Sequence, residues 1–368
     1  MGDLQRVHVH VGPPKSGSTF LQSVLFANRA ALRTAGVVVP GPDWPTHRRA
    51  CVQLMRRAAG VPARLPAGAP PRDRWDRLVR EVHDSGAHTG VLSAEQLSVA
   101  APHSVAAVVE SFTPAEVHVI YAARDLAAVV PADWQTRLRN RVAPTWREFC
   151  ASVREPRGRR SLGGVFWDHQ DPAAVLPRWL RHVPHDRVHV LTVPRAGADP
   201  ALLWRRFCAA SGLEADSYSL DVPRNNISLG GVEAEVLRRL TARVAGRLPV
   251  PVYTDLVKFF VVREVLERRE QSFRLVLPEA EHAWLDPRAE QAIRYLREAE
   301  FAVEGDLDEL TPAHRPSTRA PDDVSEAEVA ALLEEVLALT VLETARRQGG
   351  SKWTGARSVD PQEGTSDE

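Results

Sequence analysis

Valines alternate with polar residues from Arg6 to Val11, and the alternation ends at the glycine and two prolines of positions 12–14. This pattern is typical of a short β-strand that runs into a loop. From Ser18 onward, apolar residues recur three and four positions apart, which predicts a helix whose first apolar positions are Phe20, Leu21, Val24 and Leu25. A strand, a loop and a helix in succession indicate the opening of an α/β unit.

Further short apolar runs predict additional strands, and helical patterns separate them. These runs lie at residues 89–93, 117–122 and 188–193, and helical patterns lie at 104–110 and 176–181. A shorter apolar run lies at residues 36–40. Strands that alternate with helices form a parallel sheet covered on both faces. We therefore predict an α/β fold with a parallel central sheet flanked by helices, in which ligands bind beyond the carboxyl ends of the strands. The proline- and arginine-rich stretch at 41–72 predicts either irregular surface structure or an excursion that faces the substrate.

The last third of the chain carries mainly helical patterns. Strand signals fade after residue 230, and residues 232–244 and 255–269 predict amphipathic helices. Ser325 and Glu328 form a capping-box pattern that opens a further helix with an apolar stripe. The predicted organisation is a domain of residues 1–310, mainly helical at 230–310, a proline-rich linker at 311–324, a C-terminal helix at 325–348 and a disordered tail at 349–368.

Composition narrows the function classes. Apolar residues make up 44% of the chain and charged residues 26%, as in ordinary globular proteins. Lys plus Arg (47) equals Asp plus Glu (47), which argues against a general binder of nucleic acids or anionic membranes. The three cysteines form no metal or disulfide motif, and no apolar run reaches the ~18 residues that a membrane helix needs. We expect a soluble cytoplasmic protein with no nucleic-acid or membrane partner.

Residues 12–19, Gly-Pro-Pro-Lys-Ser-Gly-Ser-Thr, join the first predicted strand to the first predicted helix. The unpaired N–H groups and the positive dipole end of a helix favour an anion at such a point. Gly17 lets the backbone approach an oxyanion, and Ser18 and Thr19 supply hydroxyl donors. Lys15, one of three lysines in the chain, supplies a positive charge. The loop therefore predicts a phosphate or sulfate site, but its lysine precedes the second glycine, unlike the Walker A order.

A second anion site is predicted at Arg124, which directly follows the apolar run at 117–122. An arginine just past the carboxyl end of a buried strand points into the crevice onto which the loop at 12–19 also opens. Its planar guanidinium suits a phosphate. Together, the two sites predict a ligand that carries anionic groups at two separated places.

These residues carry a resemblance to sulfotransferases. Residues 14–19 are similar to their 5′-phosphosulfate-binding loop, and residues 119–126 (Val-Ile-Tyr-Ala-Ala-Arg-Asp-Leu) to their 3′-phosphate-binding strand and loop. The resemblance to bacterial sulfotransferase-family proteins covers roughly residues 5–310. It implies a P-loop nucleotide-kinase-like fold and 3′-phosphoadenosine 5′-phosphosulfate (PAPS) as co-substrate. It also implies sulfuryl transfer to a hydroxyl or amine of a small-molecule or carbohydrate acceptor, with no metal required.

The resemblance implies roles for particular residues. Lys15 would neutralise the bridging oxygen of the leaving phosphate, and Arg124 would bind the 3′-phosphate. The loop around the 5′-phosphate would consist of Pro14, Lys15, Ser16, Gly17, Ser18 and Thr19. The family usually has a serine eight residues after the arginine and often a proline two after it, where this chain has Ala132 and Leu126. The candidates to replace that serine are Gln135, Thr136 and Arg224.

Sulfuryl transfer needs a base that takes the proton of the acceptor. In the family this base is a histidine or a glutamate just beyond the strand that follows the early helices. The corresponding place here reads Val91-Leu92-Ser93-Ala94-Glu95, which makes Glu95 the first candidate. His10, at the end of the first strand, is the second candidate.

Two other functions stay open from the sequence. A P-loop kinase would use the same strand, loop and helix, although the GK[ST] order is missing. A catalytically silent nucleotide- or partner-binding protein of the same fold would be consistent with Ala132. It would also be consistent with the apolar stripe of the C-terminal helix, which could dock a partner or a second copy of the chain.

Overall fold

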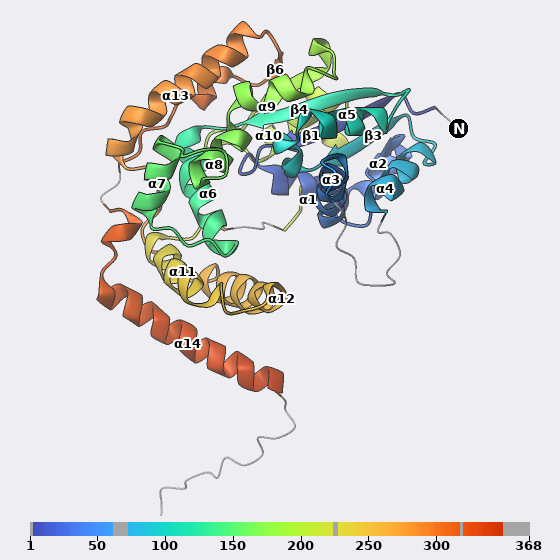
Figure 1. Ribbon diagram of the computed structural model, residues 1–368. Helices are drawn as coiled ribbons and strands as arrows, with labels where there is room; N and C mark the ends of the chain where they lie inside the picture. The colour runs from blue at the N-terminus through green and yellow to red at the C-terminus, as the bar shows by residue number, and fades with distance from the viewer. Residues whose placement is uncertain (1–2, 62–72, 224–226, 317–318, 349–368) are drawn as a thin grey trace, which may run out of the picture.

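The computed structural model describes residues 3–61, 73–223, 227–316 and 319–348 (Figure 1). Within these ranges, six strands form one parallel sheet in the order β2-β3-β1-β4-β5-β6. The strands are β1 (Arg6–Gly12), β2 (Val37–Val38), β3 (Thr89–Ser93), β4 (Glu116–Ala123), β5 (Val188–Thr192) and β6 (Ala302–Glu304). The predicted fold class, a parallel central sheet flanked by helices with a C-terminal helix, is confirmed.

Strand β1 lies at the centre of the sheet, between β3 and β4. His8 is paired with Val91 of β3 and with His118 of β4. After β1 the chain continues to β2, which lies beyond β3 on one side of β1. After β4 it continues to β5, which lies on the opposite side. The connections therefore diverge between β1 and β4, which is the switch point where open α/β sheets bind ligands.

Helices and turns of helix make up most of the remaining described chain (Figure 1). The α-helices are α1 (Ser18–Ala27), α2 (Arg29–Thr34), α3 (Trp44–Ala58), α4 (Arg74–His83), α5 (Pro102–Glu110), α6 (Leu126–Arg139), α7 (Trp146–Arg154), α8 (Leu162–Gln170), α9 (Pro172–Trp179), α10 (Ala201–Ser211), α11 (Gly231–Val244), α12 (Val250–Tyr253), α13 (Glu279–Glu298) and α14 (Glu326–Gln348). A π-helical segment, η4 (Thr254–Leu266), continues α12, and 3₁₀ turns include η1 (Glu95–Val99), η5 (Leu307–Leu310) and η6 (Pro321–Asp323). None of the helices in the described ranges combines the length and apolar character needed to cross a lipid bilayer.

Both faces of the sheet are buried by helices. On one face, the valines of β1 pack in a cluster with apolar residues of α5, α9 and α13. On the other face, Ile120 of β4 packs with residues of α1 and α10. Burial on both faces explains why the strands appear in the sequence as nearly continuous apolar runs.

A third cluster joins α6, α7, α11, η4 and α14 into a helical layer beside the sheet. The predicted C-terminal helix is present as α14, and Ser325 and Glu328 form the expected reciprocal hydrogen bonds at its start. Val329, Leu332 and Val336 of α14 are buried in this cluster, whereas Leu337 is exposed. The first half of α14 therefore packs on its own chain. Docking of a partner on the exposed part stays a prediction, and the predicted tail at 349–368 lies outside the described residues.

One local prediction is wrong. Residues 44–58, predicted as irregular surface structure, form α3, because Asp43 caps the helix by accepting from the Thr46 N–H at 2.9 Å. Its buried face consists of His47, Ala50, Cys51 and Leu54, at helical spacing between exposed arginines. Small and polar residues on that face hide the apolar periodicity. Beyond residue 230 the described chain is mainly helical, and the exception is the three-residue strand β6, which pairs with β5.

Candidate functional site

The loop between β1 and α1 turns through three left-handed backbone conformations, at Gly12 (φ 84°), Lys15 (φ 70°) and Gly17 (φ 84°). Glycine removes the steric cost of this conformation at two of the three positions. A Cβ added to Gly12 would lie 2.9 Å from the Cβ of Glu95. The missing side chain at Gly12 therefore allows the loop to approach Glu95 closely, and Gly17 ends the loop as the residue that precedes α1.

The loop presents donor groups that are not used elsewhere. Within the described ranges, the backbone N–H groups of Ser16, Gly17 and Ser18 donate no hydrogen bond. The hydroxyl of Ser16 donates to the carbonyl of Pro13 at 2.6 Å, which fixes the loop from inside. Free N–H groups at a helix N-terminus are the usual basis of an anion site. The predicted anion loop therefore has the backbone geometry that such a site requires.

Lys15 lies at the bend of the loop and is half-buried. Burial lowers the pKa of its ammonium to about 8, and the nearby positive charge of Arg139 acts in the same direction. The carboxylates of Glu95 and Asp133 partly oppose this shift. The ammonium is therefore surrounded by protein charges rather than extended into water, and an anion bound at the loop would stabilise its charged form.

Glu95 follows β3 and begins the 3₁₀ turn η1. Burial raises the pKa of its carboxyl group, while the positive charges of Lys15 and Arg48 oppose the shift. A carboxylate whose pKa is raised toward neutrality is better suited to accept a proton than an ordinary one. The structure thus brings Glu95 and Lys15 together although 80 positions separate them in the sequence.

His10, the second candidate base, lies inside the sheet and is 0% exposed. Its Nδ1 is 2.7 Å from the hydroxyl oxygen of Ser93, and its ring packs edge-on against Phe207 of α10. Burial lowers the pKa of His10 to about 4, so the ring is neutral at physiological pH. Glu95, which adjoins the loop, is better placed than His10 to meet an acceptor.

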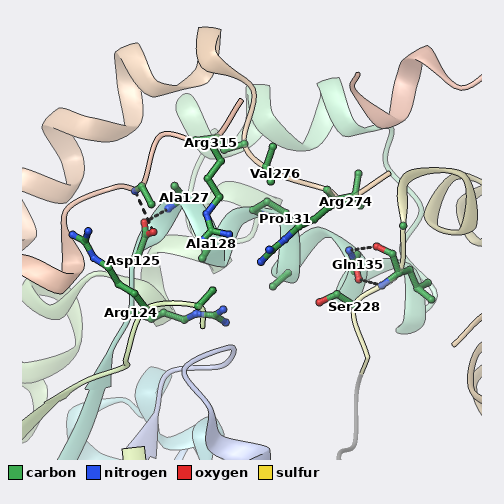
Figure 2. A pocket seen from close by; sticks show the side chains of 18 of the residues that line it. Arg124, Asp125, Ala127, Ala128, Pro131, Gln135, Ser228, Arg274, Val276 and Arg315 are labelled. Carbon is green, nitrogen blue, oxygen red and sulfur yellow. Dashed lines mark hydrogen bonds between the residues drawn. The ribbon is translucent and has the colours of Figure 1, made fainter. Parts of the chain in front are cut away.

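A pocket of about 430 Å³ opens next to the loop, beyond the ends of β4 and β5 (Figure 2). Four arginines line it: Arg124, Arg195, Arg274 and Arg315. Among the described residues, none of the four forms an ion pair, although many other arginines of the chain do. The carboxylate of Asp125, which also lines the pocket, offsets part of the charge of Arg124 and Arg195. Four guanidinium groups against one carboxylate still favour an anion in this cavity.

Arg124 connects this arginine pocket to the loop. Its Nη1 donates to the backbone carbonyl of Lys15 at 2.7 Å, and the residue also lines the pocket. The neighbouring carboxylate of Asp125 accepts from the backbone N–H groups of Ala127 and Ala313. The arginine predicted from its place after a strand therefore links the loop to the arginine pocket.

Two of the three candidates to replace the serine expected at Ala132 already form hydrogen bonds with the backbone. The side-chain amide of Gln135 is bonded to the backbone N–H and carbonyl of Leu229, as the dashed lines in Figure 2 show. The hydroxyl of Thr136 donates to the carbonyl of Ala132 at 2.9 Å. Arg224 lies outside the described residues. The pocket instead offers Arg195, Arg274 and Arg315 as binding groups.

Sequence reasoning missed these three arginines. Arg195 follows β5 by three residues, so the rule that identified Arg124 could also have identified it. Arg274 follows η4, and Arg315 follows η5, in segments without a strand signal. Nothing in their local sequence indicates that they meet, because the pocket is formed by segments far apart in the chain.

A second cavity, of about 470 Å³, lies at the start of α1. Thr19, Phe20 and Ser23 of α1 form one wall, and Leu220 and Val222 contribute apolar surface. An aromatic ring with aliphatic neighbours suits a planar, weakly polar ligand group. Because Thr19 and Phe20 directly follow the loop, this cavity adjoins the predicted anion site.

Comparisons with known proteins add little to this geometry. No protein-family model matches the chain, and no curated protein matches it either. A solved structure of a sulfotransferase from Alicyclobacillus acidocaldarius is similar at 16% sequence identity with a TM-score of 0.37. The similarity covers 67% of this chain and 97% of that chain. A similarity at this level assigns neither a ligand nor a reaction.

Proposed function

We propose that the chain is a PAPS-dependent sulfotransferase that transfers a sulfuryl group to a hydroxyl or amine acceptor. One observation carries the proposal: Arg124 is shared by two candidate anion-binding environments. One is the loop with free N–H groups and Lys15, and the other is the arginine pocket. A nucleotide with a phosphosulfate at one end and a phosphate at the other matches this arrangement.

Each part of the co-substrate has a corresponding part of the site. The 5′-phosphosulfate would lie against the N–H groups of the loop, and the 3′-phosphate would enter the arginine pocket. The adenine would occupy the second cavity and stack on Phe20. The alternative is a Mg²⁺-dependent P-loop kinase. Its Walker A loop has the lysine directly after the second glycine, whereas Lys15 precedes Gly17 in this chain.

The reaction can then be described with this chain's own groups. The acceptor oxygen or nitrogen attacks sulfur, and the bond between sulfur and the bridging phosphate oxygen breaks. The carboxylate of Glu95 takes the proton that the acceptor loses, and the electron pair of the broken bond remains on the phosphate oxygen. The ammonium of Lys15 stabilises the charge that develops on this oxygen.

Replacement of Arg315 or Arg274 by alanine tests the assignment of the arginine pocket. We expect the affinity for adenosine 3′,5′-bisphosphate to fall about 10- to 100-fold, because a charge-assisted hydrogen bond contributes about 1.5–3 kcal/mol. Affinity for adenosine 5′-monophosphate, which lacks the 3′-phosphate, should change little. Isothermal titration calorimetry with both nucleotides, without added Mg²⁺, measures the two effects.

Arg33→Ala, at an exposed position of α2, is the matched control and should bind both nucleotides like the wild type. Equal losses of affinity for the two nucleotides would contradict the assignment of the 3′-phosphate to this pocket. If the wild type binds ATP with Mg²⁺ more tightly than it binds the bisphosphate, the kinase function is favoured instead.

The lowered pKa of Lys15 predicts how nucleotide affinity depends on pH. Only the protonated ammonium attracts the 5′-phosphate, so the affinity for adenosine 3′,5′-bisphosphate should be constant at neutral pH. It should decline as pH rises through about 8, where the free protein loses this proton. Titrations between pH 7 and 9.5 measure the decline. Lys15→Ala should bind the bisphosphate more weakly than the wild type at pH 7, and its affinity should not decline near pH 8. A wild-type affinity that stays constant to pH 9.5 would contradict the prediction.

A further inference from the structure

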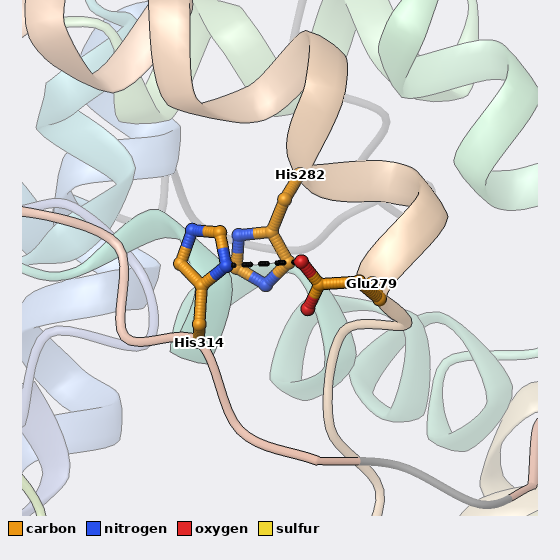
Figure 3. A group of neighbouring side chains, drawn as sticks. All are labelled: Glu279, His282 and His314. Atoms are coloured by element: carbon orange, nitrogen blue, oxygen red, sulfur yellow. Dashed lines mark hydrogen bonds and ion pairs between the residues drawn. The ribbon is translucent and has the colours of Figure 1, made fainter.

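A cluster of two histidines and two carboxylates joins α13 to the segment of residues 311–316. Glu279, His282 and Asp286 belong to α13, and His314 belongs to the segment. One potential ligand atom from each of Glu279, His282 and His314 lies within 4.8 Å of the others (Figure 3). None of these residues belongs to the loop or lines the arginine pocket.

Asp286 holds both imidazole rings from their outer sides. One of its carboxylate oxygens accepts from Nδ1 of His282 at 2.9 Å, and the other accepts from Nε2 of His314 at 2.8 Å. A nitrogen that donates to a carboxylate carries the proton of a neutral ring, so Nε2 of His282 presents its lone pair. Nδ1 of His314 lies 3.3 Å from a carboxylate oxygen of Glu279, and a bound cation would replace this contact. The inner nitrogens are therefore Nε2 of His282 and Nδ1 of His314.

The inner nitrogen of His282 has no partner of its own. The side chain is 3% exposed, and Nε2 forms no hydrogen bond within the described ranges. Figure 3 shows a ring nitrogen of His282 between the ring of His314 and the carboxylate of Glu279. A buried acceptor without a partner costs stability unless something binds it. A bound cation would satisfy it.

The ligand chemistry indicates a zinc-like ion. Two imidazole nitrogens and one carboxylate oxygen form a common three-ligand zinc set, which leaves a fourth position for water. A carboxylate that accepts from the outer nitrogens of the ligating histidines, as Asp286 does, is the usual support of such a site. Metal bonds of about 2.0–2.2 Å require the ligand atoms to come closer together. Glu279 is 78% exposed and can move inward. The rings of His282 and His314 are stacked with their centroids 3.7 Å apart, so the half-exposed ring of His314 would have to turn for both nitrogens to reach one ion.

We propose that Glu279, His282 and His314 bind one Zn²⁺ ion, and that the ion clamps the segment 311–316 onto α13. Ala313 and Arg315, on either side of His314, line the arginine pocket, so the clamp would fix one wall of that pocket. The ion lies outside the residues assigned to sulfuryl transfer, for which no metal is predicted. The proposal stands on the cluster alone and does not depend on the proposed function.

Titration of the metal-stripped full-length chain with ZnCl₂ tests the proposal by calorimetry. We expect one Zn²⁺ per chain, and a loss of affinity of about 100-fold or more in His314→Ala. Asp286→Asn, which alters only the support of the rings, should lose about 10- to 100-fold. His103→Ala, an exposed histidine at the start of α5, should retain the wild-type affinity. Substitution by Co²⁺ should give the visible absorption bands of a four-coordinate ion.

His314 is half-exposed, so its replacement leaves the core of the protein intact, and circular dichroism can verify this. Zinc should also raise the midpoint of thermal unfolding of the wild type but not of His314→Ala, because a ligand that binds only the folded state stabilises it. A wild type that binds zinc no more tightly than His314→Ala would overturn the proposal. An equal loss of affinity in His103→Ala would also overturn it.

Discussion

Lys15→Ala is expected to lower the turnover number about 10²- to 10³-fold, the loss typical when one group that stabilises a developing oxyanion is removed. The affinity for adenosine 3′,5′-bisphosphate should fall in parallel, because the same ammonium faces the 5′-phosphate. The structural reason is the position of Lys15 at a left-handed bend of the loop, where surrounding charges and burial hold the ammonium in place.

Turnover is measured as release of the bisphosphate from PAPS, with the acceptor that gives the fastest wild-type rate in a panel of hydroxyl and amine compounds. Calorimetry without metal gives the affinity. Arg346→Ala removes one positive charge from an exposed position of α14 and should change neither quantity. If Lys15→Ala retains wild-type affinity and turnover, the loop does not hold the nucleotide and the proposed function fails.

Glu95→Gln is expected to lower the turnover number about 10²- to 10⁴-fold, the usual contribution of a general base. Glutamine retains the size of the side chain but cannot take a proton from the acceptor. Because Glu95 lies on the acceptor side of Lys15 in the proposed reaction, the affinity for the bisphosphate should stay close to that of the wild type. This separates Glu95→Gln from Lys15→Ala, in which both quantities fall.

The pH dependence of kcat/KM gives a second measurement on Glu95. Burial raises the pKa of its carboxyl group, so activity should increase with pH through a value above the ordinary glutamate range. Glu95→Gln should lose this rising limb. Glu110→Gln, at the exposed end of α5, is the matched control. A Glu95→Gln variant with turnover within a few-fold of the wild type would assign the base to another group, with His10 the next candidate.

Several features of the site could be predicted from the sequence because they depend on neighbours in the chain. The strand at Arg6–Gly12, the glycines of the loop and the helix after Gly17 follow from local periodicity and backbone preference. Arg124 could be predicted for a similar reason, since the carboxyl ends of parallel strands share one edge of the sheet. Local signals failed where the buried face of a helix consists of small and polar residues, as in α3.

The rest was decided by tertiary structure, because it depends on which distant segments meet. The sequence indicated Glu95 only through a resemblance, whereas the structure places its Cβ beside Gly12 and its carboxylate near Lys15. The arginine pocket joins segments after β4, β5, η4 and η5, and the histidine cluster joins α13 to His314. Periodicity determines how each segment folds and which face it buries. The long-range packing of those faces determines which charges come together, and no spacing along the chain encodes it.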